Sequence, residues 1–402
     1  MSLAENVDYL RRIRELTSIT GFGNFPRNPR PGPGSPLVEV EGFGTNPGEL
    51  KMYCYVPAQR PVLAPLVVVL HGCGQNAAGY DLGAGWSTLA KHYGFALLMP
   101  EQQRLNNANG CFNWFNTQDI ARDRGEAGSI RQMIARMVTD HDIETRHVFV
   151  TGLSAGGAMA SVMLAIYPEM FAAGAIIAGL PFGVARSMQS ALYEMHRPTA
   201  RTATELGELV RHTSEHRGPW PKVSVWHGSA DRTVNPANAD AIVRQWLDLH
   251  GLPSAPMSEA IIDGYPRQLW WGADGETIVE SFNITDMAHG TPLGVADNDQ
   301  RYGKQGAFLI EAGISSSYHI AKFFGLTNWI RDRNTAAVEA ASARLIPPVS
   351  PIAAPGPSAD LAKVFWPATP PADRIESRRQ RRKANGVRAA LARVLAAAGL
   401  KK

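Results

Sequence analysis

Short, continuous apolar runs separated by helix-like stretches constrain the fold of this 402-residue chain most strongly. The run Pro65–Leu70 is PLVVVL and ends at a His-Gly pair, which is the pattern of a strand buried on both faces. Such alternation over roughly 300 residues predicts a mostly parallel α/β sheet with helices on both faces. The expected strands are Leu37–Val40, Leu50–Val56, Pro65–Leu70, Phe95–Met99, His147–Thr151, Ala172–Ala178, Lys222–Trp226 and Thr277–Ile284. The expected helices in this region are Trp86–Tyr93, a segment near Glu126–Asp140, and the stretches after Ser154 and Pro236.

The composition, 45% hydrophobic and 19% charged, is that of a globular chain with ample core, and it excludes a wholly disordered protein. No apolar run reaches the roughly 18 residues that a membrane helix needs. The first eight residues contain acids where an export signal would need a basic segment followed by an apolar one. We therefore expect a cytoplasmic protein.

Positive charge is concentrated at the C-terminal end. Residues 373–402 contain ten Lys and Arg and two acids, a net charge of +8, whereas residues 1–372 contain 30 Lys and Arg and 34 acids, a net charge of −4. The main body is therefore mildly acidic. A body of this charge does not indicate specific nucleic-acid binding.

The pentapeptide Gly152–Gly156, GLSAG, is the strongest chemical signal, because it lies between an apolar strand and a small-residue helix. In that context Ser154 occupies a tight strand-to-helix turn with its hydroxyl projecting from the sheet edge. The helix N-terminus directs backbone N–H groups at a developing oxyanion. We interpret Ser154 as the nucleophile of an α/β-hydrolase fold, the alternative being an ordinary Gly/Ser turn.

A serine nucleophile needs a base and an orienting acid, which in this fold follow it in the order acid, then histidine. Asp231 comes just after the apolar strand that ends at Trp226, which places it at the carboxyl edge of the sheet; the alternative is a turn aspartate. His289 lies in a short loop after the next strand. We predict Asp231 as the acid and His289 as the base.

Three other residues are weaker candidates for the acid and the base. Asp263 is a weaker acid because no clear parallel strand delivers it to the sheet edge. His227 precedes the predicted acid in the sequence, and His319 lies within an apparent helix, so both are weaker bases.

The turn after the Pro65–Leu70 strand contains two glycines, which let backbone N–H groups face a substrate. We predict that the N–H groups of Cys73 and Ala155 form the oxyanion hole. Cys73 and Cys111 flank this region and form either a disulfide or a buried reduced pair; the lack of a visible export signal favours reduced thiols. The three cysteines of the chain are too scattered for a zinc site, and this chemistry requires no metal and no organic cofactor.

Several stretches together resemble the polyhydroxybutyrate depolymerase family of α/β-hydrolase esterases, which is related to feruloyl and acetyl-xylan esterases. They lie within residues 35–325 and are LHGCGQ (Leu70–Gln75), PEQQ (Pro100–Gln103), CFNWF (Cys111–Phe115), VTGLSAGGAM (Val150–Met159), AIIAGLP (Ala175–Pro181), WHGSADRTVNP (Trp226–Pro236) and MAHGTP (Met287–Pro292). The resemblance implies Ser154 as nucleophile, Asp231 as acid and His289 as base. It also implies a substrate groove near Trp114, and it makes an extracellular location an alternative to the cytoplasm.

The predicted function is a serine esterase that hydrolyses short-chain hydroxyalkanoate esters of the polyhydroxybutyrate type, soluble or polymeric, through an acyl-enzyme on Ser154. Four aromatic residues are candidates for the walls of an apolar substrate cleft: Trp114, Phe115, Trp270 and Trp271. Each of them alone is more often a core residue. A feruloyl or acetyl-xylan type of carbohydrate esterase is the second hypothesis. A non-catalytic granule- or surface-binding protein on a hydrolase fold is the third, and the presence of all three triad residues argues against it.

We expect three parts along the chain: an α/β-hydrolase catalytic domain at 1–332, a Pro/Ala-rich linker at 333–372 and a basic amphipathic helical tail at 373–402. Within the first part, residues 3–16 are expected to form a helix and residues 26–36 a loop. The tail could contact an anionic surface or granule, or it could be a solvated terminus.

Overall fold

The computed structural model describes residues 35–328. The expected helix at residues 3–16, most of the expected loop at 26–36, the linker at 333–372 and the tail at 373–402 therefore lie outside the described residues. Within residues 35–328, no helix combines the length and the apolar character that a bilayer-spanning segment requires.

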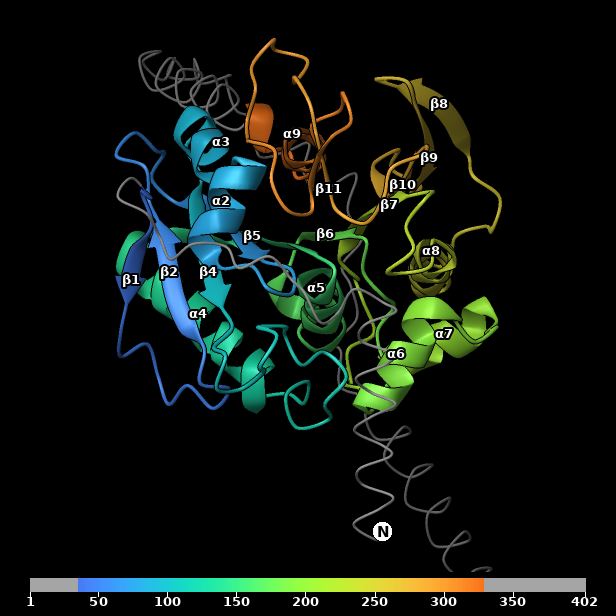
Figure 1. The fold of residues 1–402 in the computed structure, drawn as a ribbon, viewed down its shortest axis with the longest axis horizontal. Helices are drawn as coiled ribbons and strands as arrows, with labels where there is room; N and C mark the ends of the chain where they lie inside the picture. Colours follow the sequence, from blue (N-terminus) through green and yellow to red (C-terminus); the bar gives the residue numbers. More distant parts are fainter. Residues whose placement is uncertain (1–34, 329–402) are drawn as a thin grey trace, which may run out of the picture. The chain divides into compact units, whose positions relative to one another are not determined.

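A ten-stranded sheet runs through the centre of the described region (Figure 1). Its strands are β1 (Val38–Val40), β2 (Lys51–Tyr55), β3 (Ala64–Leu70), β4 (Ala96–Glu101), β5 (Ile143–Leu153), β6 (Ala173–Ile177), β7 (Lys222–Gly228), β8 (Ser258–Ile262), β9 (Tyr265–Trp271) and β10 (Thr277–Ile284). Their order across the sheet is β1-β2-β4-β3-β5-β6-β7-β10-β9-β8. The six central strands from β4 to β10 are mutually parallel, and the two outer strands at each edge are antiparallel. A separate two-stranded parallel sheet joins β11 (Thr291–Leu293) to β12 (Leu309–Glu311).

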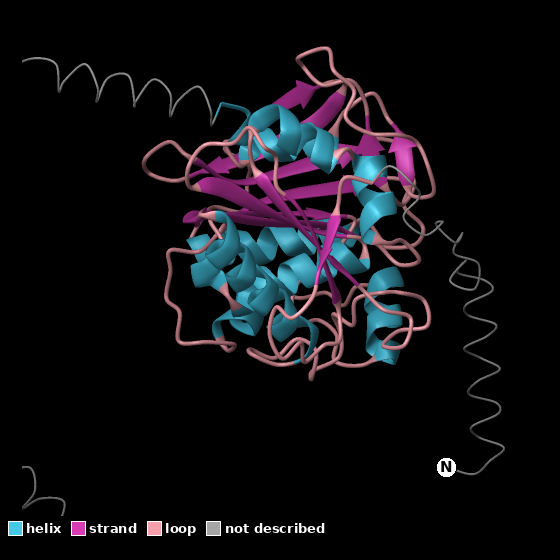
Figure 2. Ribbon diagram, turned by 90° about the vertical axis from the view of Figure 1, so that its left-hand side faces the viewer, coloured by secondary structure: helices cyan, strands magenta, loops and turns pink. Residues whose placement is uncertain are grey.

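Helices cover both faces of the large sheet (Figure 2). Residues of α4 (Gly125–His141), α5 (Ala155–Ile166), α6 (Met188–His196), α7 (Ala203–Arg211) and α8 (Ala237–His250) enter one hydrophobic cluster. Residues of α2 (Ala77–Ala84), α3 (Trp86–Tyr93) and α9 (Ser316–Phe323) enter the other. The sheet is therefore a buried layer between two apolar cores, which is the α/β-hydrolase arrangement that the sequence predicts.

Strand β3 shows why the apolar run in the sequence is continuous. Leu66, Val68 and Leu70 belong to the first cluster, whereas Val67 and Val69 belong to the second, and every residue of the strand is buried. Because successive side chains point to opposite faces, a strand between two cores needs an apolar residue at every position.

The eight expected strands are all present, with bounds within a few residues of those predicted. The sequence analysis missed α2 and the hairpin of β8 and β9. Strand β8 lies at the edge of the sheet, and its central residues Glu259, Ala260 and Ile261 are exposed. An edge strand outside the helical layers has no need of a continuous apolar run, so the pattern used to find the other strands does not detect it.

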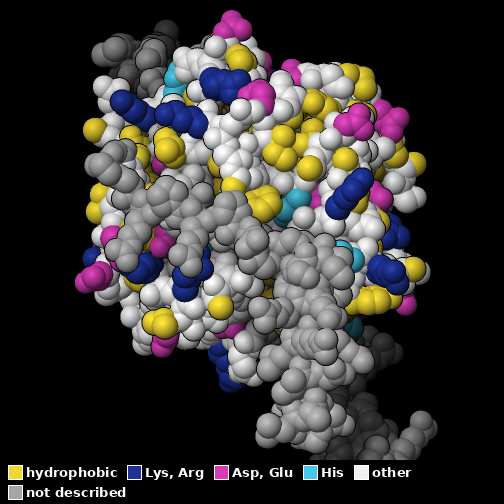
Figure 3. Space-filling view, in the orientation of Figure 1, with side chains coloured by type: hydrophobic (Ala, Val, Ile, Leu, Met, Phe, Trp, Pro, Cys, Tyr) yellow, Lys and Arg dark blue, Asp and Glu magenta, His cyan; other side chains and the backbone are white. Residues whose placement is uncertain are grey.

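Charged side chains of both signs are scattered over the face of the described region seen in Figure 3, between isolated hydrophobic side chains. On the visible part of this face, the charged side chains do not form a basic stripe like that of a typical nucleic-acid-binding domain.

Candidate active site

The three predicted catalytic residues follow three strands of the parallel part of the sheet. Ser154 follows β5, Asp231 follows β7, and His289 follows β10. Strands β5, β6, β7 and β10 are consecutive neighbours and run in one direction. Their carboxyl ends therefore meet at one edge, where open α/β sheets bind ligands.

Ser154 occupies a strained turn between β5 and α5. Its φ of 57° and ψ of −117° lie where residues with a side chain are rarely found, and such strain is typical of functional turns. The Ser154 N–H donates a 2.9 Å hydrogen bond to Ile177 O, which ties the turn to β6. The Ser154 side chain does not cap helix α5. Its hydroxyl is therefore left for chemistry.

The glycines of the pentapeptide are required by space. A Cβ on Gly156 would lie 2.3 Å from Leu70 O and 2.5 Å from His71 O, and a Cβ on Gly152 would lie 2.4 Å from the backbone of Gly156. These distances are far below van der Waals contact. The turn closes only because both positions lack a side chain.

Asp231 and His289 form a direct hydrogen bond of 2.7 Å from Nδ1 of the imidazole to Oδ2 of the carboxylate. The other carboxylate oxygen, Oδ1, accepts the N–H groups of Thr233 at 2.8 Å and Val234 at 2.9 Å. The loops after β7 and β10 are joined by further bonds, including Ala230 N–H to Met287 O at 3.1 Å. Asp231 and His289 are thus held as one unit.

The Asp231 carboxylate remains ionised over the working pH range of an esterase. Burial acts to raise the pKa of Asp231, but hydrogen bonds from His227 and His289 outweigh burial and hold the pKa well below its ordinary value. An ionised carboxylate fixes the imidazole of His289 as the tautomer with its proton on Nδ1, which leaves Nε2 able to accept a proton.

Among the hydrogen bonds of the described residues, none joins Ser154 to His289, so the contact between nucleophile and base is not formed in this structure. Contacts of this kind often tighten only when substrate binds. Val234 connects the two parts of the site, because it lines the same cleft as Ser154 and also donates its N–H to Asp231. The structure therefore brings Asp231 and His289 together and places Ser154 on the adjoining cleft.

Hydrogen bonds hold the turn after β3, and they engage the backbone N–H groups of the turn except one. Gly72 N–H binds Gln75 Oε1 at 2.8 Å, Gly74 N–H binds Asn109 O at 2.8 Å, and Gln75 N–H binds Gly72 O at 3.2 Å. Among the described residues, the N–H of Cys73 has no such acceptor. Ala155 is the first residue of α5, where helical N–H groups have no partner within the helix. Cys73 and Ala155 both line the cleft beside Ser154, as an oxyanion hole requires.

His71 is fully buried beneath this turn. Its Nδ1 lies 2.8 Å from Gly72 O, and its Nε2 accepts Gln102 N–H at 3.1 Å. Burial lowers the pKa of His71 to about 4, so the ring is neutral at physiological pH. His71 therefore supports the turn through two hydrogen bonds.

Cys73 and Cys111 form a disulfide, so the expectation of reduced thiols is wrong. The loop that carries Cys111 crosses directly over the Cys73 turn, as the bond from Gly74 to Asn109 also shows. The buried carboxyl group of Glu126 supports this loop by accepting Asn113 N–H at 2.8 Å and Asn113 Nδ2 at 2.7 Å. Burial raises the pKa of Glu126 to about 8. The two cysteines lie 38 positions apart in the sequence, so no local pattern indicates that they are close in space.

The cleft at Ser154 has a volume of about 240 Å³ and is mainly apolar. One wall is α6, which contributes Met188, Ala191, Leu192 and Met195, the i, i+3, i+4, i+7 face of a helix. Trp114 and Phe115, two of the predicted substrate residues, also line the cleft, and their rings pack edge to face at 5.6 Å. The polar side chains that line the cleft are Asn107, Asn109 and Ser154.

Trp270 and Trp271 do not line this cleft, which corrects the expectation for both residues. They lie on β9, and Trp270 is 2% exposed within the hydrophobic core, with its Nε1 donating to Ala255 O at 2.9 Å. Trp271 is 37% exposed, and its backbone N–H contacts the sulfur of Met257. Their place in an antiparallel strand near the sheet edge, which the sequence analysis did not detect, explains their apolar character.

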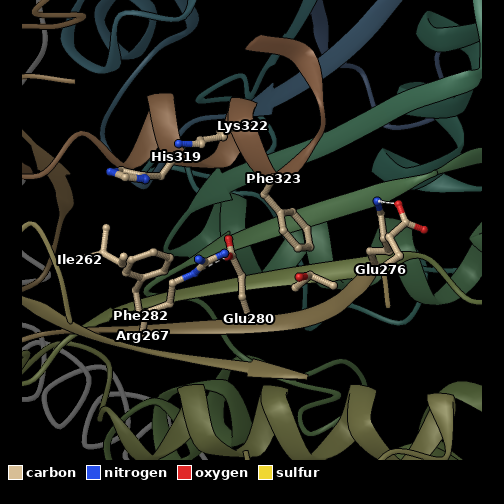
Figure 4. Close-up of a pocket in the computed structure, with 10 residues that line it drawn as sticks. Ile262, Arg267, Glu276, Glu280, Phe282, His319, Lys322 and Phe323 are labelled. Atoms are coloured by element: carbon tan, nitrogen blue, oxygen red, sulfur yellow. Dashed lines mark hydrogen bonds and ion pairs between the residues drawn. The ribbon is translucent and has the colours of Figure 1, made fainter. Parts of the chain in front are cut away.

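A second cleft of about 280 Å³ lies between α9 and strands β9 and β10 (Figure 4). Lys222 and Thr277, which line it, are the first residues of β7 and β10, so this cleft lies away from the carboxyl edge of these strands. The charged side chains and the histidine that line this cleft each pair with a side chain of opposite type. The pairs are Arg267–Glu280, Lys222–Glu276, Lys322–Asp297 and His319–Asp263. The weaker candidates His319 and Asp263 thus pair with each other, apart from Ser154.

Comparison with known proteins assigns the family. The model of the esterase PHB depolymerase family matches residues 51–261. Poly(3-hydroxyalkanoate) depolymerase C of Paucimonas lemoignei is 45% identical over 291 residues, which are 72% of this chain and 70% of that protein. The chain belongs to the PHB depolymerase family of esterases.

More distant relatives agree with this assignment. An acetylxylan esterase of Coprinopsis cinerea is 31% identical over 267 residues, covering 65% of this chain and 70% of that protein. The solved acetyl xylan esterase from Aspergillus awamori superposes with a TM-score of 0.61 at 24% identity, covering 72% of this chain and 99% of that one. The protein is therefore an ester hydrolase with the α/β-hydrolase fold.

Sequence reasoning missed two features of the esterase site. His227 Nε2 lies 3.1 Å from Asp231 Oδ2, so a second histidine reaches the acid. The His-x-x-x-Asp spacing at the end of a strand was the available signal. The α6 wall was also missed, although Met188, Leu192 and Met195 show helical spacing in the sequence.

We predict that the double variant Cys73→Ser/Cys111→Ser loses about 2–4 kcal/mol of unfolding free energy, because a cross-link closing a loop of this size restricts the unfolded chain. Ester hydrolysis should fall at least about tenfold, since the turn that holds the Cys73 N–H loses its tether. Urea unfolding and p-nitrophenyl butyrate hydrolysis measure the two effects. Cys54→Ala, at the buried free cysteine, is the control and should keep its activity. A double variant as stable and active as the parent would contradict this role.

Proposed function

We propose that this esterase cleaves polyesters of short hydroxyalkanoic acids by serine catalysis. The observation that carries the proposal is the position of Ser154: a serine in a strained turn that lines an apolar cleft together with Val234, whose N–H binds the Asp231 carboxylate of the Asp231–His289 pair. The name of the Paucimonas lemoignei relative supports the polyester substrate.

The geometry supports a two-step mechanism. Ser154 Oγ attacks the ester carbonyl while His289 Nε2 takes its proton, and Asp231 stabilises the resulting imidazolium. The carbonyl oxygen becomes an oxyanion and accepts the N–H groups of Cys73 and Ala155. The C–O bond then breaks, and His289 returns its proton to the departing alcohol. Water attacks the acyl-enzyme in the same way, releasing the acid and restoring Ser154.

The cleft favours an apolar acyl group. Its side chains are mainly aliphatic, aromatic or sulfur-containing, and the carboxamides of Asn107 and Asn109 are the groups that could bind further ester oxygens. A polyester with short alkyl branches offers this combination of apolar surface and regularly spaced carbonyls.

A feruloyl ester is the second candidate substrate. The edge-to-face pair of Trp114 and Phe115 provides an aromatic wall, against which a feruloyl ring could pack. The names of several relatives, which are feruloyl and acetylxylan esterases, support this alternative.

We also propose that the enzyme works in an oxidising compartment. The disulfide between Cys73 and Cys111 supports this location over the cytoplasm, where thiols are kept reduced. The predicted contact of the tail at 373–402 with an anionic surface or granule remains a prediction, because the tail lies outside the described residues.

A substrate panel tests the function most simply. We expect a polyhydroxybutyrate emulsion to be cleared with release of soluble hydroxy acids, and p-nitrophenyl butyrate to be hydrolysed. Methyl ferulate should be turned over with a kcat/KM at least about 100-fold lower, since pocket complementarity worth about 3 kcal/mol gives such discrimination. Efficient hydrolysis of methyl ferulate with no clearing of the emulsion would favour the carbohydrate-esterase alternative.

We predict that Ser154→Ala and His289→Ala each lower kcat for p-nitrophenyl butyrate by at least about 10³-fold, because each removes one member of a group that acts as a unit. Circular dichroism and thermal unfolding verify that both variants are folded. His319→Ala, which disrupts the unrelated pair with Asp263, should lose less than about twofold in activity. Substantial activity in Ser154→Ala would contradict serine catalysis.

The rate should have a single acidic limb. Because the pKa of Asp231 is held well below its ordinary value, the carboxylate stays ionised above about pH 4, and protonation of an imidazole then controls the rate. The value of kcat/KM for a neutral ester should therefore fall about tenfold per pH unit once the pH is low enough to protonate that imidazole. A profile that stays flat to pH 4 would show that a carboxylate, not an imidazole, acts as the base.

A further inference from the structure

The Asp231 carboxylate is bound by two imidazoles. His289 Nδ1 lies 2.7 Å from Oδ2, and His227 Nε2 lies 3.1 Å from the same oxygen. His227 comes from the end of strand β7, whereas His289 comes from the loop after β10. Among the described residues, these two are the ionisable groups whose hydrogen bonds and charges lower the pKa of this carboxyl group. The serine mechanism uses only one of them.

The surroundings of His227 determine where its proton lies. Nε2 is 3.1 Å from Asp231 Oδ2 and 3.0 Å from Val234 O, and both of these atoms accept hydrogen bonds. Nε2 therefore carries a hydrogen, shared between the two acceptors. Nδ1 of His227 is buried and has no hydrogen-bond partner within the described part of the chain. A proton added there would create a buried, unsatisfied N–H group, which is costly.

His289 binds the same carboxylate with the opposite ring nitrogen. Its Nδ1 faces Asp231, and its Nε2 is not among the buried, unpartnered atoms of the described residues. A ring held in this way can accept a proton on Nε2 from a substrate complex. His227, by contrast, directs its one ring N–H, on Nε2, at the Asp231 carboxylate. Its other ring nitrogen, Nδ1, is buried. The two rings are therefore suited to different tasks.

We propose that His227 is a positioning residue that fixes the Asp231 carboxylate in the orientation His289 requires; this inference rests on the serine mechanism proposed above. The N–H groups of Thr233 and Val234 hold Oδ1, and His227 completes the set on Oδ2. Without the His227 donor, the carboxylate can rotate away from His289.

Two substitutions at His227 distinguish the loss of its hydrogen-bond donor from the loss of its side-chain volume. In His227→Gln, the side-chain amide can place an N–H near the position of Nε2, whereas His227→Leu fills the space without a donor. We expect His227→Leu to lower kcat for p-nitrophenyl butyrate about 10- to 100-fold, as for the loss of one hydrogen bond to a charged group, with KM changed less than about twofold. The acidic limb of kcat/KM should move to lower pH, because a carboxylate that has rotated away stabilises the imidazolium of His289 less. His227→Gln should recover at least half of the loss in log kcat and return the acidic limb of kcat/KM to its parental position.

His319→Leu is the matched control. His319 also donates through Nε2 to a carboxylate, Asp263 Oδ2, at 2.8 Å, but this pair lies away from Ser154. Its kcat and its acidic limb should equal those of the parent. Thermal unfolding of each variant separates loss of fold from loss of alignment.

A measurement on the parent protein does not depend on the folding of any variant. Nitrogen-15 spectra of histidine-labelled protein at pH 8 should show His227 with its hydrogen on Nε2, the signal being assigned by its absence from His227→Gln. A hydrogen on Nδ1 would overturn the inference, and so would a folded His227→Leu with parental kcat and pH profile. If His289→Ala and Ser154→Ala were fully active, the serine mechanism itself would fail. Inactivity of those two variants with a normal His227→Leu would remove only the role of His227.

Discussion

The turn between β5 and α5 depends on how closely helix α5 approaches strand β3. Gly156 approaches the carbonyl oxygens of Leu70 and His71 so closely that any side chain would collide with them. This approach places the first N–H of α5 beside the turn after β3, so both predicted oxyanion donors line one cleft. Ser154, at this junction, has a strained backbone with a positive φ. A looser junction would separate the serine from the amides that stabilise its intermediate.

The buried carboxylate of Asp231 connects the other half of the site. Two backbone amides and two imidazoles bind its oxygens, and these donors come from the loop after β7, from β7 itself and from the loop after β10. An isolated charge in such a place would be strongly disfavoured, but four N–H donors offset the cost of desolvation. Asp231 is thus both a structural link between neighbouring loops and the group that holds the imidazole of His289.

The order of residues along the chain was sufficient to identify Ser154, Asp231 and His289 as candidates, because each follows a strand of a parallel sheet. The pattern of β3 was decisive for the fold, since a strand between two cores must be apolar throughout. Other features depend on distances that no local pattern records. Cys73 and Cys111 lie 38 positions apart and form a disulfide because two loops cross.

Two features were missed for related reasons. His227 was ranked below His289 as a base because it precedes Asp231, and its bond to Asp231 was not foreseen, although a histidine four positions before a turn aspartate can bind it when the chain reverses. Trp270 and Trp271 resembled cleft residues because the edge hairpin of β8 and β9 was not detected. In both cases the missing information was the path of the chain beyond the end of a strand.

A crystal structure of the enzyme inactivated by an alkyl phosphonate would show whether Ser154 is the nucleophile and where its oxyanion is bound. We expect a phosphorus atom bonded to Ser154 Oγ, with its oxygen about 2.7–3.1 Å from the N–H groups of Cys73 and Ala155 and its alkyl chain in the cleft walled by α6. An adduct on another residue, or a phosphonyl oxygen directed away from both amides, would contradict this expectation.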